Sequence, residues 1–367
     1  MGYYITNVLI DTLHNLINKD CKGYLAFKRT NTLDRLKEEI LNKGGQLIFD
    51  ESHFIIIVLG DYIEVISNED IYLDNRGGYK ERGLFEGKRF GAIDISGISM
   101  DGTESFYAMF RRCKTKTVIF GDIDTSNVKE FNRMFEGADI DKLDLSNLNF
   151  ERVYNLDWMF AGSKINILDL HGINTNNAFS FDSMFRNATI KILNISGMET
   201  SNAKVLRSMF LGCNTYTNID ISGIDMNNAV DTSDMFKNTV SKVVGVDGIR
   251  LHNVKVCTSM FENATLGSFD FSDIGLDKAL YANNMFKGVK VDIPVGDKSL
   301  SSIKNEGIMT TDYFLYGSKL EGNIDMGEFN LYSGYGYREP VEMFNGCRAR
   351  VTGKNFIYEN EEIKKFL

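Results

Sequence analysis

The five residues Met134-Phe135-Glu136-Gly137-Ala138 decide the fold of this chain, because their pattern returns at a fixed interval. Successive Met-Phe pairs are separated by 25, 25, 25, 25, 26, 25 and 25 residues. A constant step of this length is typical of a solenoid, in which each repeat forms one coil that stacks on the next. We therefore expect function to reside on a surface built from equivalent positions of neighbouring coils. The pairs begin at Met109, Met134, Met159, Met184, Met209, Met235, Met260 and Met285.

The repeats extend beyond the perfect copies in both directions. Leu84-Phe85 lies 25 residues before the first perfect copy, replaces only the methionine and predicts an entry coil. After the last perfect copy the step lengthens to Tyr313-Phe314 and then to Met343-Phe344, which predicts two coils with insertions. The sequence therefore predicts about eleven coils in a solenoid domain spanning residues 84–350. A C-terminal cap or helix is expected at 351–367.

Composition limits the functional classes open to the protein. Of its 367 residues, 43% are hydrophobic and 25% are charged, which is ordinary for a globular protein. The net charge of −9 and the pI near 5.2 argue against a general binder of nucleic acid or anionic membrane, since both require a basic surface. The N-terminus lacks the basic region of a secretory signal, and the longest apolar run, Phe54–Gly60, has the length of a strand. We therefore expect a cytoplasmic protein, with the cell surface as the alternative.

Cysteine and histidine positions give no sign of a metal centre or a catalytic group. Cys113, Cys213 and Cys347 follow their repeat methionines by four residues, where other coils place Ala or Ser, so we expect buried, reduced thiols. The four histidines have neither metal-ligand nor catalytic spacing, and the common hydrolase, zincin and phosphate-loop motifs are missing. We therefore predict no cofactor, no metal site and no enzymatic activity.

The first 83 residues do not repeat and predict a small mixed α/β domain. Apolar residues at helical spacing predict a helix over 4–18, and Thr32 precedes a second helix over 33–42. This domain either caps the open edge of the first coil or acts as a separate recognition module. Its strands are expected at 24–27, 46–49, 53–59 and 62–66.

Each repeat predicts one strand, one turn and one short helix. Counted from its methionine, a coil carries apolar residues at positions 9 and 11, as in Leu143 and Leu145, and this alternation is typical of a strand. After a polar turn, Ser or Asn precedes apolar residues at a spacing of three, as in Val128, Phe131 and Met134, which favours a short helix. The predicted fold class is therefore an α/β solenoid with a parallel sheet and short helices.

The repeat words resemble those of a known family. Leu143–Ser146 (LDLS), Asp124–Val128 (DTSNV) and Met134–Gly137 (MFEG) are similar to the repeat of the BspA-like leucine-rich-repeat family. The likeness covers about residues 84–347. It implies a leucine-rich-repeat solenoid that acts as a binding surface. Members of the family often lie on bacterial or protist cell surfaces, so the resemblance also implies adhesion to host proteins.

Acidic side chains recur at the outward position of the predicted strands. On stacked strands they would lie about 5 Å apart and repel one another unless something basic binds them. One interpretation is therefore an acidic stripe that takes a basic partner or cations. The other is that each carboxylate accepts hydrogen bonds from its own turn. These candidate partner-binding residues are Asp94, Asp144, Asp169, Asp220 and Asp270, with Asn194 interrupting the row.

Two segments depart from the repeat and are further candidates for partner binding. The first is a dense basic cluster, for which a solvated loop is the alternative explanation. Its members are Arg111, Arg112, Lys114 and Lys116. The second is a glycine-rich insertion whose exposed Tyr and Arg would favour an interface, although a C-terminal cap explains it equally well. Its members are Tyr332, Tyr335, Tyr337 and Arg338.

These observations predict a protein-protein interaction scaffold without catalytic activity. Because no export signal is visible, we favour an intracellular protein partner, as for a phage or mobile-element inhibitor or adaptor. One alternative is a cell-surface adhesin of the BspA-like type. Another is an acidic mimic of nucleic acid that blocks a nucleic-acid-binding protein. We expect no direct contact with nucleic acid or membrane.

Overall fold

The computed structural model describes the repeat region almost continuously and the two ends of the chain in part. The chain divides into two compact units, Met1–Asn174 and Thr175–Leu367, and this boundary falls inside the coil that begins at Met159. The described residues are 3–5, 7–16, 23–51, 54–59, 62–67, 71–73, 83–269, 274–291, 298–299, 310–319, 323–325, 343–347 and 350–352.

The first unit begins with a mixed α/β segment whose elements follow the predicted order. Strands β3, β4 and β5 form an antiparallel run, and β2 lies parallel to β5. In α2, Leu33 and Ile40 bury their side chains against Ile55 and Ile66, which fixes this helix to the sheet. The two predicted helices and four predicted strands are thus confirmed to within a few residues, whereas β1, which replaces the start of the predicted helix over 4–18, and β6 were not predicted. The elements are β1 (Tyr3–Ile5), α1 (Asn7–Leu16), β2 (Tyr24–Arg29), α2 (Leu33–Asn42), β3 (Gln46–Glu51), β4 (Phe54–Leu59), β5 (Tyr62–Ser67) and β6 (Ile71–Leu73).

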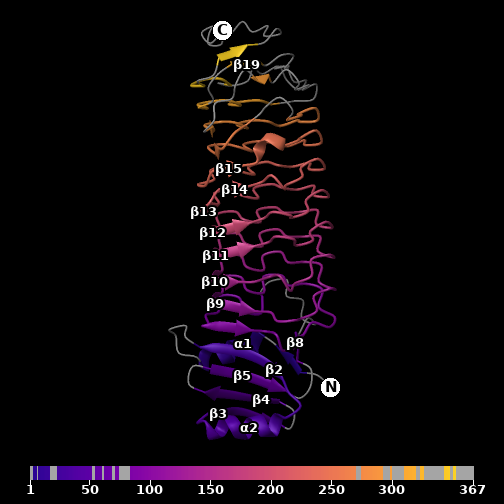
Figure 1. Cartoon of the computed structure of the whole chain (residues 1–367), viewed down its shortest axis with the longest axis vertical. Coiled ribbons are helices and arrows are strands. Elements are labelled where there is room, and N and C mark those ends of the chain that lie inside the picture. The colour runs from indigo at the N-terminus through magenta and orange to yellow at the C-terminus, as the bar shows by residue number, and fades with distance from the viewer. Residues whose placement is uncertain are drawn as a thin grey trace. The chain divides into compact units, whose positions relative to one another are not determined.

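The parallel sheet continues from this segment into the coils of the first unit (Figure 1). Strand β2 pairs with β7 (Ala92–Asp94), so that Leu25 lies opposite Ile93. The sheet then runs through β9 (Lys114–Ile119), β10 (Asp139–Leu143) and β11 (Lys164–Asp169). A smaller sheet joins β1, β6 and β8 (Ile98–Ser99). The N-terminal segment therefore covers a strand edge that the first coil would otherwise expose, as a cap does. The domain boundary at residue 83 stays a prediction, as does a recognition role for the segment.

The second unit builds the same coil, and after β12 its described strands are only two or three residues long. Strand β12 (Thr189–Asn194) pairs with β13 (Asn214–Thr215). All described strand pairs in this unit are parallel, as the solenoid prediction requires. A second sheet contains β14 (Ile219–Asp220), β15 (Val243–Val244), β16 (Thr265–Leu266) and β17 (Lys290–Val291), and a third contains β18 (Lys298–Ser299), β19 (Asn323–Asp325) and β20 (Arg350–Thr352). A single 3-10 turn, η1 (Val246–Gly248), follows β15.

The Met-Phe segment of each described coil is a run of turns, and not the short helix that the sequence predicts. Its backbone N–H groups donate alternately to a carbonyl of the next coil and to a carbonyl three residues back in the same coil. The Phe110 N–H donates to the Met134 carbonyl of the next coil at 2.8 Å, whereas the Met109 N–H donates to the Phe106 carbonyl at 3.1 Å. A helix would direct every amide to the fourth residue back, so bonding between coils replaces it. Residues with positive φ, such as Gly137 at 66°, complete the change of direction.

The last coils keep this hydrogen-bond register across longer steps. The Phe286 N–H donates to the Phe314 carbonyl, and the Leu315 N–H donates to the Met343 carbonyl, both at 2.9 Å. Phe314-Leu315 therefore occupies the Met-Phe position, and the predicted alignment on Tyr313-Phe314 is wrong by one residue. Phe314 occupies the position that methionine has in the other coils. Tyr313 has a positive φ, as does the residue before the methionine in those coils.

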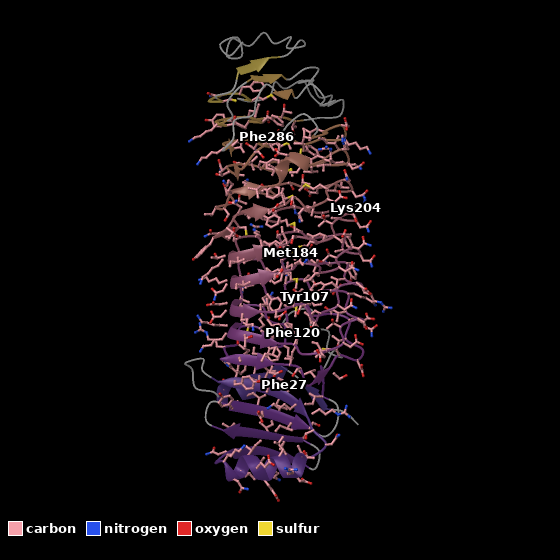
Figure 2. All side chains as sticks on the ribbon, in the orientation of Figure 1. Phe27, Tyr107, Phe120, Met184, Lys204 and Phe286 are labelled. Carbon is pink, nitrogen blue, oxygen red and sulfur yellow. The ribbon has the colours of Figure 1, made fainter. Side chains whose placement is uncertain are left out.

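A column of buried phenylalanine rings forms the centre of the core in each unit. In both columns, neighbouring rings lie 5.1–5.6 Å apart between centroids, with planes within 13° of parallel. Stacking of this kind contributes about 0.5–1.5 kcal/mol per pair beyond the burial of the rings. The predicted burial of Cys113, Cys213 and Cys347 is confirmed. The rings are Phe85, Phe110, Phe135 and Phe160 in the first unit, and Phe185, Phe210, Phe236, Phe261 and Phe286, which Figure 2 labels, in the second.

We expect Phe210→Ala to lower the free energy of unfolding by about 3–5 kcal/mol, because it removes a ring stacked on both sides and leaves a cavity. The matched control is Phe179→Ala in the same unit, where 45% of the side chain is exposed and about 1 kcal/mol or less should be lost. Urea unfolding of the full chain measures both effects. Equal losses for the two variants would contradict a core organised around the column.

Candidate functional site

Each described outward aspartate accepts a hydrogen bond from the turn that follows its own strand. The side-chain oxygen and the amide two residues further on form an Asx turn. Asn194 accepts the same bond from Ser196 at 3.1 Å, so a neutral amide oxygen serves equally well. These bonds agree with the interpretation in which each carboxylate accepts hydrogen bonds from its own turn. The amide donors are Ser96 for Asp94, Ser146 for Asp144, His171 for Asp169 and Ser222 for Asp220, at 2.9–3.0 Å.

The expected acidic stripe is broken more often than the sequence analysis recognised. In the first unit Asp94 lies opposite Ile119, whose side chain is exposed on the same face. In the second unit Asp220 lies opposite Val244. Only Asp144 and Asp169, on adjacent strands of the first unit, form a neighbouring carboxylate pair among the described members of the row. The described aspartates are therefore local turn acceptors, and their role in partner binding stays a prediction.

The turn bonds also affect the ionisation of Asp144 and of Asp124. Hydrogen bonds from the backbone and side chain of Ser146 hold the pKa of Asp144 below its usual value. In the same way Ser126, whose amide donates to Asp124 at 2.9 Å, lowers the pKa of that carboxyl. Bonding to the charged form favours the carboxylate. At these two turns the acceptor is therefore an ionised carboxylate at neutral pH.

The basic cluster of the sequence lies in one coil of the first unit, and two of its members pair with carboxylates of neighbouring coils. The Arg111 guanidinium is half-buried and donates to Glu86 of the preceding coil, with Nε 2.8 Å from Oε1. The Lys114 ammonium lies 2.8 Å from the Asp139 carboxylate of the following coil. Arg112 is exposed at a φ of 55°, where most coils place Gly or Asn. Two of the predicted cations thus bridge coils, and the role of Arg111 and Arg112 in partner binding stays a prediction.

Ion pairs between coils are also frequent in the second unit. The buried Glu262 carboxylate lies between the Lys237 ammonium, 3.1 Å away, and the Lys287 ammonium, 3.3 Å away. Partial burial pulls the pKa of Glu262 upward, but hydrogen bonds from Ser259 and Lys237 outweigh it and hold the pKa below its ordinary value. These charges stabilise the stack, so they are poor candidates for contacts with a partner.

The remaining predicted site residues lie outside the described residues. Asp270 belongs to the outward row, and the tyrosine-rich insertion lies near the C-terminus. Their assignment to partner binding stays a prediction. The residues of the insertion are Tyr332, Tyr335, Tyr337 and Arg338.

Sequence reasoning missed a group of exposed apolar side chains on the strand face of the second unit. Tyr216 is 71% exposed, Val240 is 68% exposed and Ile192 is 48% exposed. The 26-residue step between Met209 and Met235 marks the position in the sequence, because the extra residue falls next to Tyr216. Apolar residues at outward positions were the signal that could have identified the group.

The four described thiols, Cys113, Cys213, Cys257 and Cys347, are buried. Burial raises the pKa of Cys213 and Cys257 to about 12 and also raises that of Cys113. Within the described ranges, no three His, Cys, Asp or Glu side chains are grouped as a metal site would require. In the same part of the chain, no helix has both the length and the apolar character needed to span a bilayer.

The fold and its surfaces define a class of protein, a parallel-sheet solenoid with a repeated interior and a variable exterior. A family model described as "Mycoplasma protein of unknown function, DUF285" matches residues 104–218 and again residues 180–294. Together these matches cover more than half of the chain, so the protein belongs to this family. No curated protein and no solved structure matches the chain.

We expect Asp144→Asn to change the free energy of unfolding by less than about 0.5 kcal/mol, because the amide oxygen keeps the bond from Ser146, whereas Asp144→Ala should cost about 1 kcal/mol. Because the pKa of Asp144 is lowered in the folded protein, its contribution to the free energy of unfolding depends on pH. The contribution of the ionised carboxylate is present above the unfolded-state pKa of about 3.9 and is lost as the pH falls through the lower folded-state pKa. Asp144→Asn should lack this loss.

Urea unfolding of both variants at neutral and acidic pH, with an NMR titration of the Asp144 carboxyl carbon, measures these effects. A titration midpoint at or above about 3.9 would contradict the turn-acceptor role. Equal destabilisation by Asn and Ala would do the same.

Proposed function

We propose that the protein is a non-enzymatic scaffold that binds another protein through the outer surface of its coils. The observation that carries the proposal is a constant interior beneath a variable exterior. On three adjacent strands of the first unit, the outward residue changes from Lys114 to Asp139 to Lys164, so the sign of the charge reverses at each coil. The next residue of each strand is buried in every case: Thr115, Ile140 and Ile165.

The architecture suits a binding surface of this kind. Backbone amides of one coil bond the carbonyls of the next, as in Phe110 to Met134, so the outer side chains are presented from an ordered frame. Preorganisation of this kind reduces the entropy lost on binding. A typical interface of about 800 Å² per partner would span several strands at a spacing of about 4.8 Å. Different partners can therefore be recognised by exchanging outward residues without changing the core.

The surface chemistry favours a protein partner over the alternatives. Deep burial of the described cysteines speaks against thiol catalysis. The interruptions by Ile119 and Val244 break the regular spacing of charge that a mimic of nucleic acid would need. The likeness to the BspA-like leucine-rich-repeat family supports a binding role, and the identity of the partner would decide between an intracellular protein and a host protein met at the cell surface. The narrower assignment to a phage or mobile-element inhibitor stays a prediction.

The test is affinity capture with the purified full chain, followed by calorimetry with each purified candidate. Lysate and extracellular protein of the source cells are used as separate inputs, because they separate an intracellular partner from an extracellular one. We expect at least one protein to bind directly with a Kd of about 10 μM or tighter. Loss of binding after charge reversal on the surface, with an unchanged urea midpoint, would place the contact on the coils. Failure of every candidate from both inputs to bind the purified chain would contradict a scaffold function.

A further inference from the structure

The strand face of the second unit carries a bulge at the 26-residue step. The bulge lies between two pairs of residues that face each other on neighbouring coils. Between these pairs one coil has three residues, Tyr216–Asn218, and the next coil has only Lys242. The pairs are Thr215 with Ser241, whose hydroxyl donates to the Thr215 carbonyl at 2.8 Å, and Ile219 with Val243. The bulge lies between β13 and β14, which Figure 1 labels. Insertions of this kind redirect side chains, and proteins often place them at functional sites.

Three apolar side chains gather around this bulge from three successive coils. The Tyr216 N–H donates to the Lys191 carbonyl at 3.0 Å, which places Tyr216 beside β12 and next to Ile192. The Val240 N–H donates to the Cys213 carbonyl at 3.0 Å, which places Val240 on the other side. Since adjacent strands lie about 4.8 Å apart, the three side chains fall within about 10 Å along the stack. All three are exposed on the strand face of the second unit, and they form the apolar cluster of this face.

The charge around the cluster indicates the chemistry of its partner. Lys191 precedes Tyr216 by one coil and Lys242 follows it by one coil, so an exposed aromatic ring lies between two lysines in a protein of net charge −9. Lysines beside an apolar anchor favour carboxylates on the partner. A two-fold contact centred on Tyr216 would set these lysines against their own copies, so a second copy of this chain is a poor fit.

We propose that Lys191, Ile192, Tyr216, Val240 and Lys242 form a docking site for a protein segment that carries apolar side chains flanked by carboxylates. The proposal rests on the proposed scaffold function and specifies the partner chemistry of one of its surfaces. Tyr216 serves as the anchor, because tyrosine buries a large area at low entropic cost. The two lysines steer and orient the acidic flanks of the segment.

Another face of the same unit shows why this cluster is the better site. Phe179 and Tyr281 are 45% and 42% exposed there, but four coils separate them, so they form no common patch. Lys204 lies on that face, away from the strands (Figure 2). This face therefore supplies matched controls, an exposed tyrosine and exposed lysines in the same unit but without the cluster.

The experiment is a selection from a random peptide phage library on the immobilised full chain, followed by fluorescence polarisation with the selected peptides. We expect the selected sequences to place Asp or Glu around an aromatic or aliphatic residue. Tyr216→Ser combined with Val240→Ser should weaken their binding about tenfold or more, as should Lys191→Glu combined with Lys242→Glu. The controls Tyr281→Ser and Lys204→Glu combined with Lys255→Glu should change it less than about twofold. Binding should also weaken as salt increases.

Several results would overturn the proposal. These are a library that yields no binder, selected peptides without acidic residues, and equal losses in the site and control variants. The proposal would also be overturned if sedimentation velocity showed a dimer that Tyr216→Ser converts to a monomer, because a second copy would then occupy the cluster. Circular dichroism and urea midpoints confirm that each variant is folded. A captured protein that binds the site variants and the wild type equally would remove this site but leave the scaffold function intact, whereas capture of nothing by the wild type would remove both.

Discussion

The hydrogen bond from a central phenylalanine amide to the methionine carbonyl one coil further on, as in Phe110 to Met134, is the constraint on which the rest of the structure depends. It fixes the register at about 25 residues, and this register stacks Phe110 on Phe85 and Phe135 with rings nearly parallel. The same register places the small side chains of Cys113 and Ala138 side by side in the interior. It also requires residues at positive φ on either side of the Met-Phe pair, such as Arg133 and Gly137. For a residue with a Cβ this costs about 1–2 kcal/mol, which the buried column offsets.

Because the register is set from within, the outer side chains are free to vary. Asx turns close each strand with an aspartate or asparagine, and ion pairs such as Lys114 with Asp139 join neighbouring coils. These contacts account for much of the charge that looks functional in the sequence. What distinguishes the Tyr216 cluster is that it serves no evident purpose within the stack. There the register is relaxed, because the three residues Tyr216–Asn218 lie opposite Lys242 alone, and apolar side chains are exposed to solvent.

Periodicity made the solenoid, its parallel strands and the buried faces predictable, since a step of 25 and an alternation of two leave few other arrangements. The helix at Leu33–Asn42 was equally predictable from the sequence, because the residues at its two ends are typical of helix boundaries. The segment from Val128 to Met134 was mistaken for a helix because a spacing of three suits both a helix and a run of turns. Only the partner of each amide separates the two, and that partner lies a whole coil away. The Tyr216 cluster escaped notice for a similar reason, since the repeat identifies outward positions but not which of them end up beside one another at a bulge.

The most direct test of the register is disulfide formation between Lys142→Cys and Ile167→Cys, two outward residues that lie opposite each other on β10 and β11. Paired parallel residues bring their Cα atoms to about 4.8 Å, within the range of about 4.4–6.8 Å that a disulfide needs. The control pair, Asp139→Cys and Ile167→Cys, is three residues out of register and about 11 Å apart. The account predicts rapid oxidation of the first pair and none of the second, with the buried native thiols unreactive. Oxidation of the control pair in preference to the first would contradict the register, and with it the frame that presents the binding surface.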